Sequence, residues 1–264
     1  MVQVSAREVK ALRDATGAGM MDAKRALIEA AGDPAEAAEV LKRKGLAKAA
    51  ERADRDASEG AVAIAVADGG GSASLVYLRS ETDFSAKAED FAACTSEIAD
   101  AVLADGPDAA AAFADRIDGL RLAKKENISL AAALRVRADE GNTLDTYLHR
   151  QDGRGVNGVI VEGAGVEAEV LHQVALHVAF AKPRYLHRDE VPPADVERER
   201  ASLLALTKAE GRPEQAWDKI VQGRLAGWFR ESVLLEQGLH GERTTVAQSI
   251  GAGRIVRFEQ ACLG

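Results

Sequence analysis

One glycine-containing segment has the spacing of a nucleotide-binding turn. Gly163, Gly165 and Ala168 match the dinucleotide fingerprint, and they lie after a predicted strand and before a predicted helix. That fingerprint belongs to a doubly wound parallel sheet, whereas the strand before Gly163 forms part of a predicted hairpin and no series of strand–helix crossovers follows. Glu162 and Glu167 would also repel a pyrophosphate. We therefore interpret the segment as a tight turn, with nucleotide binding as the alternative.

The histidines and cysteines form no catalytic or metal-binding pattern. His172 and His177 are five residues apart on one predicted helix, so their side chains diverge. Cys94 and Cys262 are distant in sequence and are typical of reduced thiols in a cytoplasmic protein. His149 stands at a strand end without a neighbouring acid or nucleophile, and neither a nucleophile elbow nor a phosphate loop is present. We therefore predict no enzymatic activity, no metal site and no cofactor.

The segment from Glu81 to Phe91 joins a predicted strand to a helix that we expect to run to about residue 104. Thr82 and Asp83 occupy the N-cap region, where an acidic side chain is favoured by unpaired amides. Phe84 precedes Phe91 by seven residues. In one interpretation Asp83 caps the helix and Phe84 is its first core residue. In the other, both side chains are exposed and contact a partner.

Composition limits the range of partners. The 264 residues are 47% apolar but only 4% aromatic, so the cores must consist mainly of aliphatic side chains. A net charge of -8 argues against broad electrostatic binding of nucleic acid or of an anionic membrane. We find no long apolar run without charges, so the sequence predicts neither a signal peptide nor a membrane span. We expect a cytoplasmic protein that binds a protein or a small ligand.

Residues 1–55 have the pattern of three short helices followed by a linker helix. Ser5 begins the first helix with capping-box spacing, and Gly17 can close it in a left-handed conformation. The second helix is expected to turn Ile28 inward, and the third is expected to end at Gly45. A bundle with so few large apolar residues is typical of a docking module.

After residue 55 the hydrophobic period changes to that of strands, and the chain repeats a hairpin followed by a helix. Two similar halves packed as one core are the natural inference. The predicted parts are a first half-core at residues 56–142, a second half-core at 143–192, a helical hairpin at 193–234 and a return to the second half at 235–264. The predicted class is α+β.

Two long segments resemble the signatures of bacterial elongation factor Ts. The first runs from Leu12 to Leu27, and the second runs from Glu81 to Phe91. Shorter matches follow in order at Tyr147–His149, Leu176–Ala179, Ile220–Arg224 and Ile255–Glu259. The resemblance covers essentially the whole chain. It implies an N-terminal three-helix domain of the ubiquitin-associated type, a two-part α+β core with antiparallel sheets, and an inserted antiparallel helical hairpin.

The resemblance also implies a function. Members of this family catalyse guanine nucleotide exchange on elongation factor Tu, the GTPase that carries aminoacyl-tRNA, and they make or break no covalent bond. The implied partner is thus elongation factor Tu, without direct contact to nucleic acid or membrane and without a small-molecule substrate. The implied partner-binding residues are Thr82, Asp83, Phe84 and Ser85, which disturb the magnesium and phosphate site, together with Met20, Met21 and His149 at other contacts.

The sequence departs from the family pattern at two positions of the second signature. Ser85 replaces a residue that is usually apolar and β-branched, and Ala88 replaces a residue that is usually Asn. Two other classes of function remain as alternatives. One is a stable interaction scaffold that combines a helical docking module with an α+β dimerisation core. The other is a nucleotide-dependent enzyme.

Overall fold

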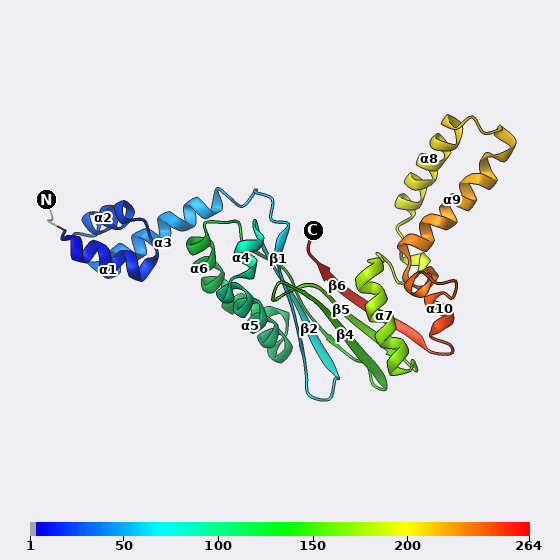
Figure 1. The fold of residues 1–264 in the computed structure, drawn as a ribbon, viewed down its shortest axis with the longest axis horizontal. Coiled ribbons are helices and arrows are strands. Elements are labelled where there is room, and N and C mark those ends of the chain that lie inside the picture. The colour runs from blue at the N-terminus through cyan, green and yellow to red at the C-terminus, as the bar shows by residue number, and fades with distance from the viewer. Residues whose placement is uncertain (1–3) are drawn as a thin grey trace.

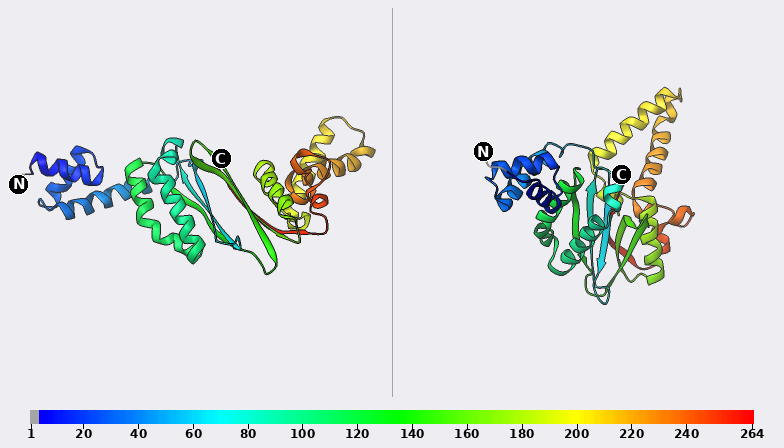
Figure 2. Two further views of the ribbon diagram at one scale, coloured as in Figure 1. Left: turned by 60° about the horizontal axis from the view of Figure 1, so that its bottom comes forward. Right: turned by 60° about the vertical axis from the view of Figure 1, so that its left-hand side comes forward.

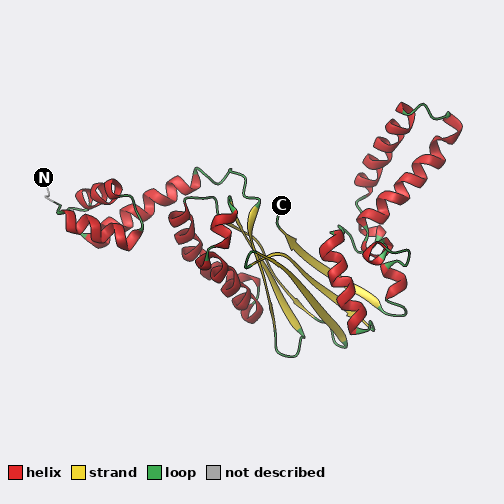
Figure 3. Ribbon diagram, in the orientation of Figure 1, coloured by secondary structure: helices red, strands yellow, loops and turns green. Residues whose placement is uncertain are grey.

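The computed structural model describes residues 4–264 and shows a molecule that is elongated along one axis (Figure 1). A three-helix bundle lies at one end, an antiparallel sheet with its covering helices lies in the middle, and a two-helix hairpin projects at the other end. The strands are confined to this middle part (Figure 3). The predicted α+β class is therefore confirmed. Among the described helices, none combines the length and the apolar character that a membrane span requires.

The N-terminal bundle consists of α1 (Ala6–Thr16), α2 (Met20–Glu29) and α3 (Pro34–Ala50). The Ser5 hydroxyl accepts a hydrogen bond from the Glu8 amide and the Glu8 carboxylate accepts one from the Ser5 amide, so the predicted capping box is present. Leu27 is buried, but Ile28 is 49% exposed. The prediction that Ile28 points inward was wrong, because the inward face of α2 already contains Leu27 and consecutive helical residues point about 100° apart.

The sequence predicted that the third helix ends at Gly45, but helix α3 continues beyond this residue. Its second half packs on α6 (Ala114–Lys124) of the core. A Cβ atom added at Gly45 would lie only 2.2 Å from Cδ2 of Leu122, so the glycine permits close helix packing and does not terminate the helix. An ion pair of 3.1 Å between Lys42 and Asp115 connects the same two helices.

The first half of the core is a strand hairpin, a helical layer and a third strand. Its elements are β1 (Glu59–Val66), β2 (Ser72–Ser80), α4 (Asp83–Lys87), α5 (Glu89–Asp105), a 3-10 segment (Pro107–Phe113), α6 and β3 (Ser129–Arg137). β3 pairs antiparallel with β2. The single helix expected after Thr82 is in fact two helices, because Ala88 between them is extended, with φ -67° and ψ 141°.

The second half repeats this topology. Its elements are β4 (Asn142–Gln151), β5 (Arg154–Ala164), α7 (Ala168–Ala181), α10 (Val246–Ser249) and β6 (Arg254–Cys262). β6 pairs with β5 as β3 pairs with β2, so in each half the third strand adds to the second strand of the hairpin. The internal repeat predicted from the sequence is confirmed at this level. The residue boundaries proposed for the domains stay a prediction.

The two half-sheets are joined edge to edge at one point and packed face to face elsewhere. The pair Val62–Gly155 is the one register position that links β1 to β5 in the described chain. Val62, Leu75 and Tyr77 of the first half share a buried cluster with Ile160 of the second. On the outer faces, α5 covers β1 and β2, and α7 covers β4 and β5. The core thus has helices outside and the two sheet halves inside (Figure 2).

The projecting hairpin consists of α8 (Pro193–Ala209) and α9 (Trp217–Ser232), which lie between α7 and α10 in the sequence. Near its tip the guanidinium of Arg224 donates to both carboxylate oxygens of Glu210, at 2.8 and 2.7 Å. The indole N–H of Trp217 donates to the carbonyl of Arg212. The first contact connects α9 to the end of α8, and the second connects α9 to the loop between the two helices. The hairpin itself projects away from the core (Figure 1).

Candidate functional site

Helix α4 and the residue before it form the second signature. The Oγ1 atom of Thr82 accepts a hydrogen bond of 3.3 Å from the Ser85 amide, so Thr82 is the N-cap. Asp83 is the first helical residue, and its carboxylate accepts a hydrogen bond from Lys87 at 2.7 Å. The interpretation of Asp83 as the cap was therefore wrong. Its carboxylate is directed mainly to the Lys87 side chain, with a weaker contribution from the Phe84 amide.

Phe84 is exposed over 83% of its surface, whereas Phe91 is fully buried. The extended backbone of Ala88 separates the two helices, so the helical phase of Phe84 does not continue to Phe91. A spacing of seven residues places two side chains on one face only within one continuous helix. The interpretation of Phe84 as a core residue is therefore wrong. The structure instead presents an aromatic ring to solvent from a five-residue helix.

A carboxylate from elsewhere in the chain contacts the start of α4. Oε1 of Glu126 accepts hydrogen bonds of 2.6 Å from both the Thr82 hydroxyl and the Ser85 hydroxyl, and Oε2 accepts one of 3.1 Å from the Thr82 amide. Ser85 is buried, so its hydroxyl needs a partner. The departure from the family pattern at Ser85 thus places a polar side chain where the fold provides an acceptor.

Lys87 joins the signature to the second half of the core. Its ammonium contacts Asp83 at 2.7 Å and Asp152, in the turn between β4 and β5, at 3.0 Å. The hydrogen bond from Lys87 lowers the pKa of Asp83, and the bonds to Asp83 and Asp152 raise the pKa of Lys87. Both groups are therefore charged at neutral pH, and an acidic side chain stands next to Phe84.

Asp83 and His149 line the same cleft, which has a volume of about 790 Å³. The cleft lies between α4, the β4–β5 hairpin and the end of α7. His149 is exposed, and its Nδ1 atom lies 3.2 Å from the Tyr147 hydroxyl. No carboxylate among its described hydrogen-bond partners would support proton transfer. The position favours a binding role over a catalytic one.

Met20 and Met21 lie on α2 in the N-terminal bundle and are both exposed. They do not line the cleft that contains Asp83 and His149. The structure therefore brings Asp83 and His149 together but leaves the two methionines on a separate surface. Flexible thioether side chains are well suited to contact a protein partner.

Phe180 is an exposed aromatic residue that the sequence reasoning missed. It lies at the C-terminal end of α7, lines the cleft with His149 and is 82% exposed. The buried positions Val174 and Val178 define the inward face of α7. Phe180 is two residues beyond Val178, about 200° around the helix, so its outward position was readable from the helical period.

The nucleotide-binding interpretation of the glycine segment does not fit the fold. Gly163 lies within β5, where it pairs antiparallel with Thr143. A Cβ atom there would approach Leu171 to 2.9 Å, and Gly165 has a φ of +64° in the turn before α7. Packing and turn geometry thus explain both glycines, and the parallel sheet that the fingerprint requires is replaced by an antiparallel one.

The histidines of α7 have separate structural partners. Nδ1 of His172 lies 3.0 Å from an Asp145 carboxylate oxygen, while the buried His177 contacts Gln237 and His240. Within residues 4–264, no group of three or more His, Cys, Asp or Glu side chains is arranged to hold a metal ion. The prediction that these histidines diverge agrees with their contacts.

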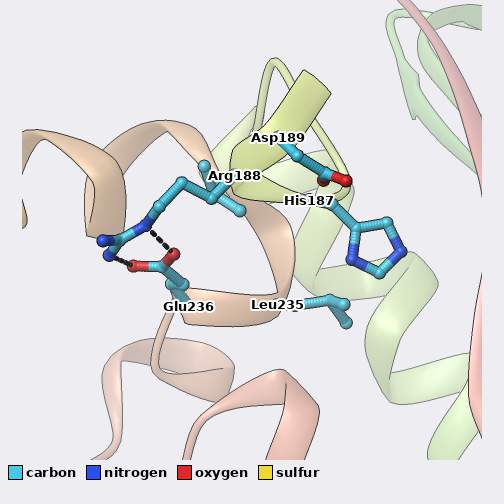
Figure 4. Close-up of a pocket in the computed structure, with 6 residues that line it drawn as sticks. His187, Arg188, Asp189, Leu235 and Glu236 are labelled. Atoms are coloured by element: carbon cyan, nitrogen blue, oxygen red, sulfur yellow. Dashed lines mark hydrogen bonds and ion pairs between the residues drawn. The ribbon is translucent and has the colours of Figure 1, made fainter. Parts of the chain in front are cut away.

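A second cleft, of about 520 Å³, lies at the base of the helical hairpin (Figure 4). The Arg188 guanidinium and the Glu236 carboxylate form a two-bond ion pair on one side, and the His187 ring lies on the other. The opposite charges of Arg188 and Glu236 neutralise each other. The cleft contains none of the residues predicted from the signatures, so we assign no function to it.

Comparisons with known proteins agree with the resemblance. The family model described as Elongation factor TS matches residues 81–260. Elongation factor Ts of Cutibacterium acnes (strain DSM 16379 / KPA171202) is 46% identical, with 97% of this chain and 98% of the relative covered. The protein of that name from Clavibacter michiganensis subsp. michiganensis is 42% identical over 90% and 89%, and that from Paenarthrobacter aurescens is 39% identical over 98% and 99%. This chain belongs to the elongation factor Ts family.

Proposed function

We propose that the protein is a cytoplasmic translation elongation factor that promotes GDP release from elongation factor Tu and stabilises the nucleotide-free GTPase until GTP binds. It acts by non-covalent binding and not as an enzyme with a substrate of its own. The observation that carries the proposal is the exposure of Phe84, at 83%, within the second signature. Membership of the elongation factor Ts family supports the choice of partner.

Thermodynamics defines what such a factor must do. It speeds nucleotide release only by binding the nucleotide-free or distorted GTPase better than the loaded one. Because coupling is reciprocal, the incoming GTP weakens the binding of the factor in turn. A thousandfold loss of nucleotide affinity requires about 4 kcal/mol of differential contact. Burial of one Phe side chain contributes about 1.5 to 3 kcal/mol, which is a substantial part of that requirement.

The geometry of α4 suits this task. Phe84 projects from a helix whose first turn is fixed by hydrogen bonds, so little backbone conformational entropy is lost when the ring is buried in a partner. Asp83 beside it is ionised and partly exposed, and it can disturb the charges around a bound Mg²⁺ and phosphate. Met20, Met21 and His149 would supply affinity at the other contacts.

The test compares Phe84→Ala with Phe91→Ala in stopped-flow release of fluorescent GDP from elongation factor Tu, at low and high Mg²⁺. Phe84→Ala should melt like the parent, because truncation of an exposed side chain seldom changes the folding stability by more than about 0.5 kcal/mol. Its stimulated release should nevertheless fall at least tenfold, which corresponds to about 1.4 kcal/mol. Phe91→Ala should lose about 3 to 5 kcal/mol of folding stability.

The matched control is Leu206→Ala, which truncates a half-exposed apolar residue on the projecting hairpin. It should leave both melting and release unchanged. A stable Phe84→Ala variant that releases GDP at the parental rate would remove the role assigned to α4. A parental protein that binds elongation factor Tu without speeding release would instead support the scaffold alternative.

A further inference from the structure

We infer that Glu126 is a positioning residue for nucleotide exchange, because its carboxylate fixes the first turn of α4 and thereby the orientation of Phe84. The inference rests on the proposed exchange function. Glu126 lies in the short connection between α6 and β3, 44 residues after Thr82 and outside both signature segments. The sequence alone offers no sign of the contact.

Three donors converge on this carboxylate. The Thr82 amide contacts Oε2 at 3.1 Å, and the hydroxyls of Thr82 and Ser85 contact Oε1 at 2.6 Å each. Bonds of this length between hydroxyls and a carboxylate are charge-assisted and stronger than neutral ones. A carboxylate can accept about four hydrogen bonds, so all three are compatible with one group.

Apart from the ion pair of Lys87 with Asp152 at its end, helix α4 has few other contacts that keep its orientation. It contains five residues, and only Ser85 and Ala86 are buried. A helix of one turn is unstable alone, because it gains too few internal hydrogen bonds for the dihedral angles that it fixes. The N-cap bond from the Ser85 amide to Thr82 is long, at 3.3 Å. The Glu126 carboxylate therefore provides the shortest polar contacts at the start of the helix.

Glu126 is itself held in place from both sides. Lys125 before it adopts a left-handed conformation, with φ +60°, that turns the chain at the end of α6. Asn127 after it donates its amide to Oε1 of Glu81 at 2.7 Å. Hydrogen bonds therefore run in both directions between the two segments: Glu81 accepts from the amide of Asn127, and Glu126 accepts from the amide of Thr82. This reciprocal pair resists rotation of α4 relative to the core.

The test uses Glu126→Ala and Glu126→Gln in the full-length protein. Two quantities are measured at a temperature where every variant is folded: hydrogen exchange of the Thr82 amide, and release of fluorescent GDP from elongation factor Tu over a range of factor concentrations. For Glu126→Ala we expect the rate of hydrogen exchange at the Thr82 amide to rise at least tenfold. Release at saturating factor should fall about five- to tenfold, while the half-saturating concentration changes less than about twofold, because the other contacts supply most of the affinity.

Glu126→Gln keeps one carbonyl acceptor for the two hydroxyls but places an NH₂ group near the Thr82 amide. It should therefore restore part of the release rate and little of the amide protection. The control is Glu140→Ala, which removes an exposed carboxylate in the β3–β4 turn that has no hydrogen bond within residues 4–264. It should match the parent in both measurements.

The outcomes separate the inference from the proposed function. If Glu126→Ala releases GDP at the parental rate although its Thr82 amide has lost protection from hydrogen exchange, the positioning role is overturned and the proposed exchange function stands. Unchanged Thr82 protection in Glu126→Ala overturns the inference at its geometric basis. A parental protein that does not speed GDP release overturns the proposed function and the inference together.

Discussion

The Nζ atom of Lys87 on α4 lies 3.0 Å from Oδ2 of Asp152 in the turn between β4 and β5. The two residues belong to different halves of the core, whose strands β1 and β5 pair at one register position within the described chain. Lys87 also contacts Asp83, so a single ammonium group connects the second signature to the hairpin that contains His149. The parts of the candidate site that lie on different halves are thus coupled by an ion pair at the surface.

Replacement of Lys87 should change the titration of Asp83. The Lys87 hydrogen bond lowers the pKa of Asp83, so Lys87→Ala should raise that pKa toward its ordinary value. Asp152→Ala leaves the Lys87–Asp83 contact in place and should keep the Asp83 pKa depressed. Carboxyl chemical shifts followed by NMR across the acid range would measure both. An Asp83 pKa that does not move in Lys87→Ala would show that the carboxylate has another partner in solution.

Substitution of Gly155 should weaken the junction of the two half-sheets. A Cβ atom at this position would lie 2.1 Å from the Val62 carbonyl oxygen, and a backbone atom cannot rotate away. We expect Gly155→Ala to cost at least about 1 to 3 kcal/mol of folding stability. Gly119→Ala in α6 is the control, because no atom lies within 4 Å of its added Cβ and Ala favours a helix by about 1 kcal/mol. Urea unfolding would give both values, and equal stability of the two variants would contradict the close approach.

Local signals in the sequence were sufficient for most elements. The capping box at Ser5 involves residues within four positions of each other, and the strand hairpins are marked by alternation and glycine turns. The repeat was visible for the same reason, because each half carries its own pattern. The resemblance added the partner-binding roles proposed for Phe84 and His149, which no local rule supplies.

The errors arose where a distant segment or an unmarked break decides the structure. Ala88 has no helix-breaking side chain, so nothing in the sequence separates α4 from α5. Gly45 reads as a helix end until Leu122, 77 residues later, is seen against it. Glu126 likewise contacts Thr82 across a long stretch of chain. Tertiary contacts of this kind override local preference.

His149 and Phe180 should contribute to affinity and not to the rate of the saturated complex. Both line the cleft and are exposed. The Phe180 ring has no group that transfers protons, and His149 has no carboxylate among its described hydrogen-bond partners. Truncation of an aromatic anchor at an interface can cost about 2 kcal/mol or more, so Phe180→Ala should weaken binding to elongation factor Tu by more than tenfold. Calorimetry on Phe180→Ala and His149→Ala would measure the affinity. A reduced GDP release rate at saturating factor, with unchanged affinity, would contradict the binding role.

His177 should make the second half of the core sensitive to acid. Its Nδ1 accepts a hydrogen bond of 3.1 Å from the His240 amide, and its Nε2 lies 2.9 Å from Oε1 of Gln237. The Gln237 amide group donates to the Glu231 carbonyl, which fixes Oε1 as the acceptor and so places the His177 proton on Nε2. A second proton on Nδ1 would remove the bond from His240.

Burial lowers the pKa of His177 in the folded protein, with the nearby His240 acting in the same direction. The unfolded chain therefore binds the proton first as the pH falls. The stability that the neutral imidazole contributes is complete above the unfolded pKa of about 6.5 and declines as the pH falls from there to the folded-state pKa. One proton limits this decline to about 1.4 kcal/mol per pH unit.

Thermal melts of the parent and His177→Gln between pH 7.5 and 5.5 would test this dependence. Gln can still donate and accept but does not titrate, so the melting temperature of His177→Gln should fall less steeply with acid than that of the parent. His187→Gln removes an exposed imidazole that has no hydrogen bond to a described side chain, and it controls for the His-to-Gln replacement itself. Its melting temperature should fall as steeply as that of the parent. If His177→Gln and the parent lose stability equally between these pH values, the acid sensitivity lies elsewhere and the neutral state assigned to His177 is wrong.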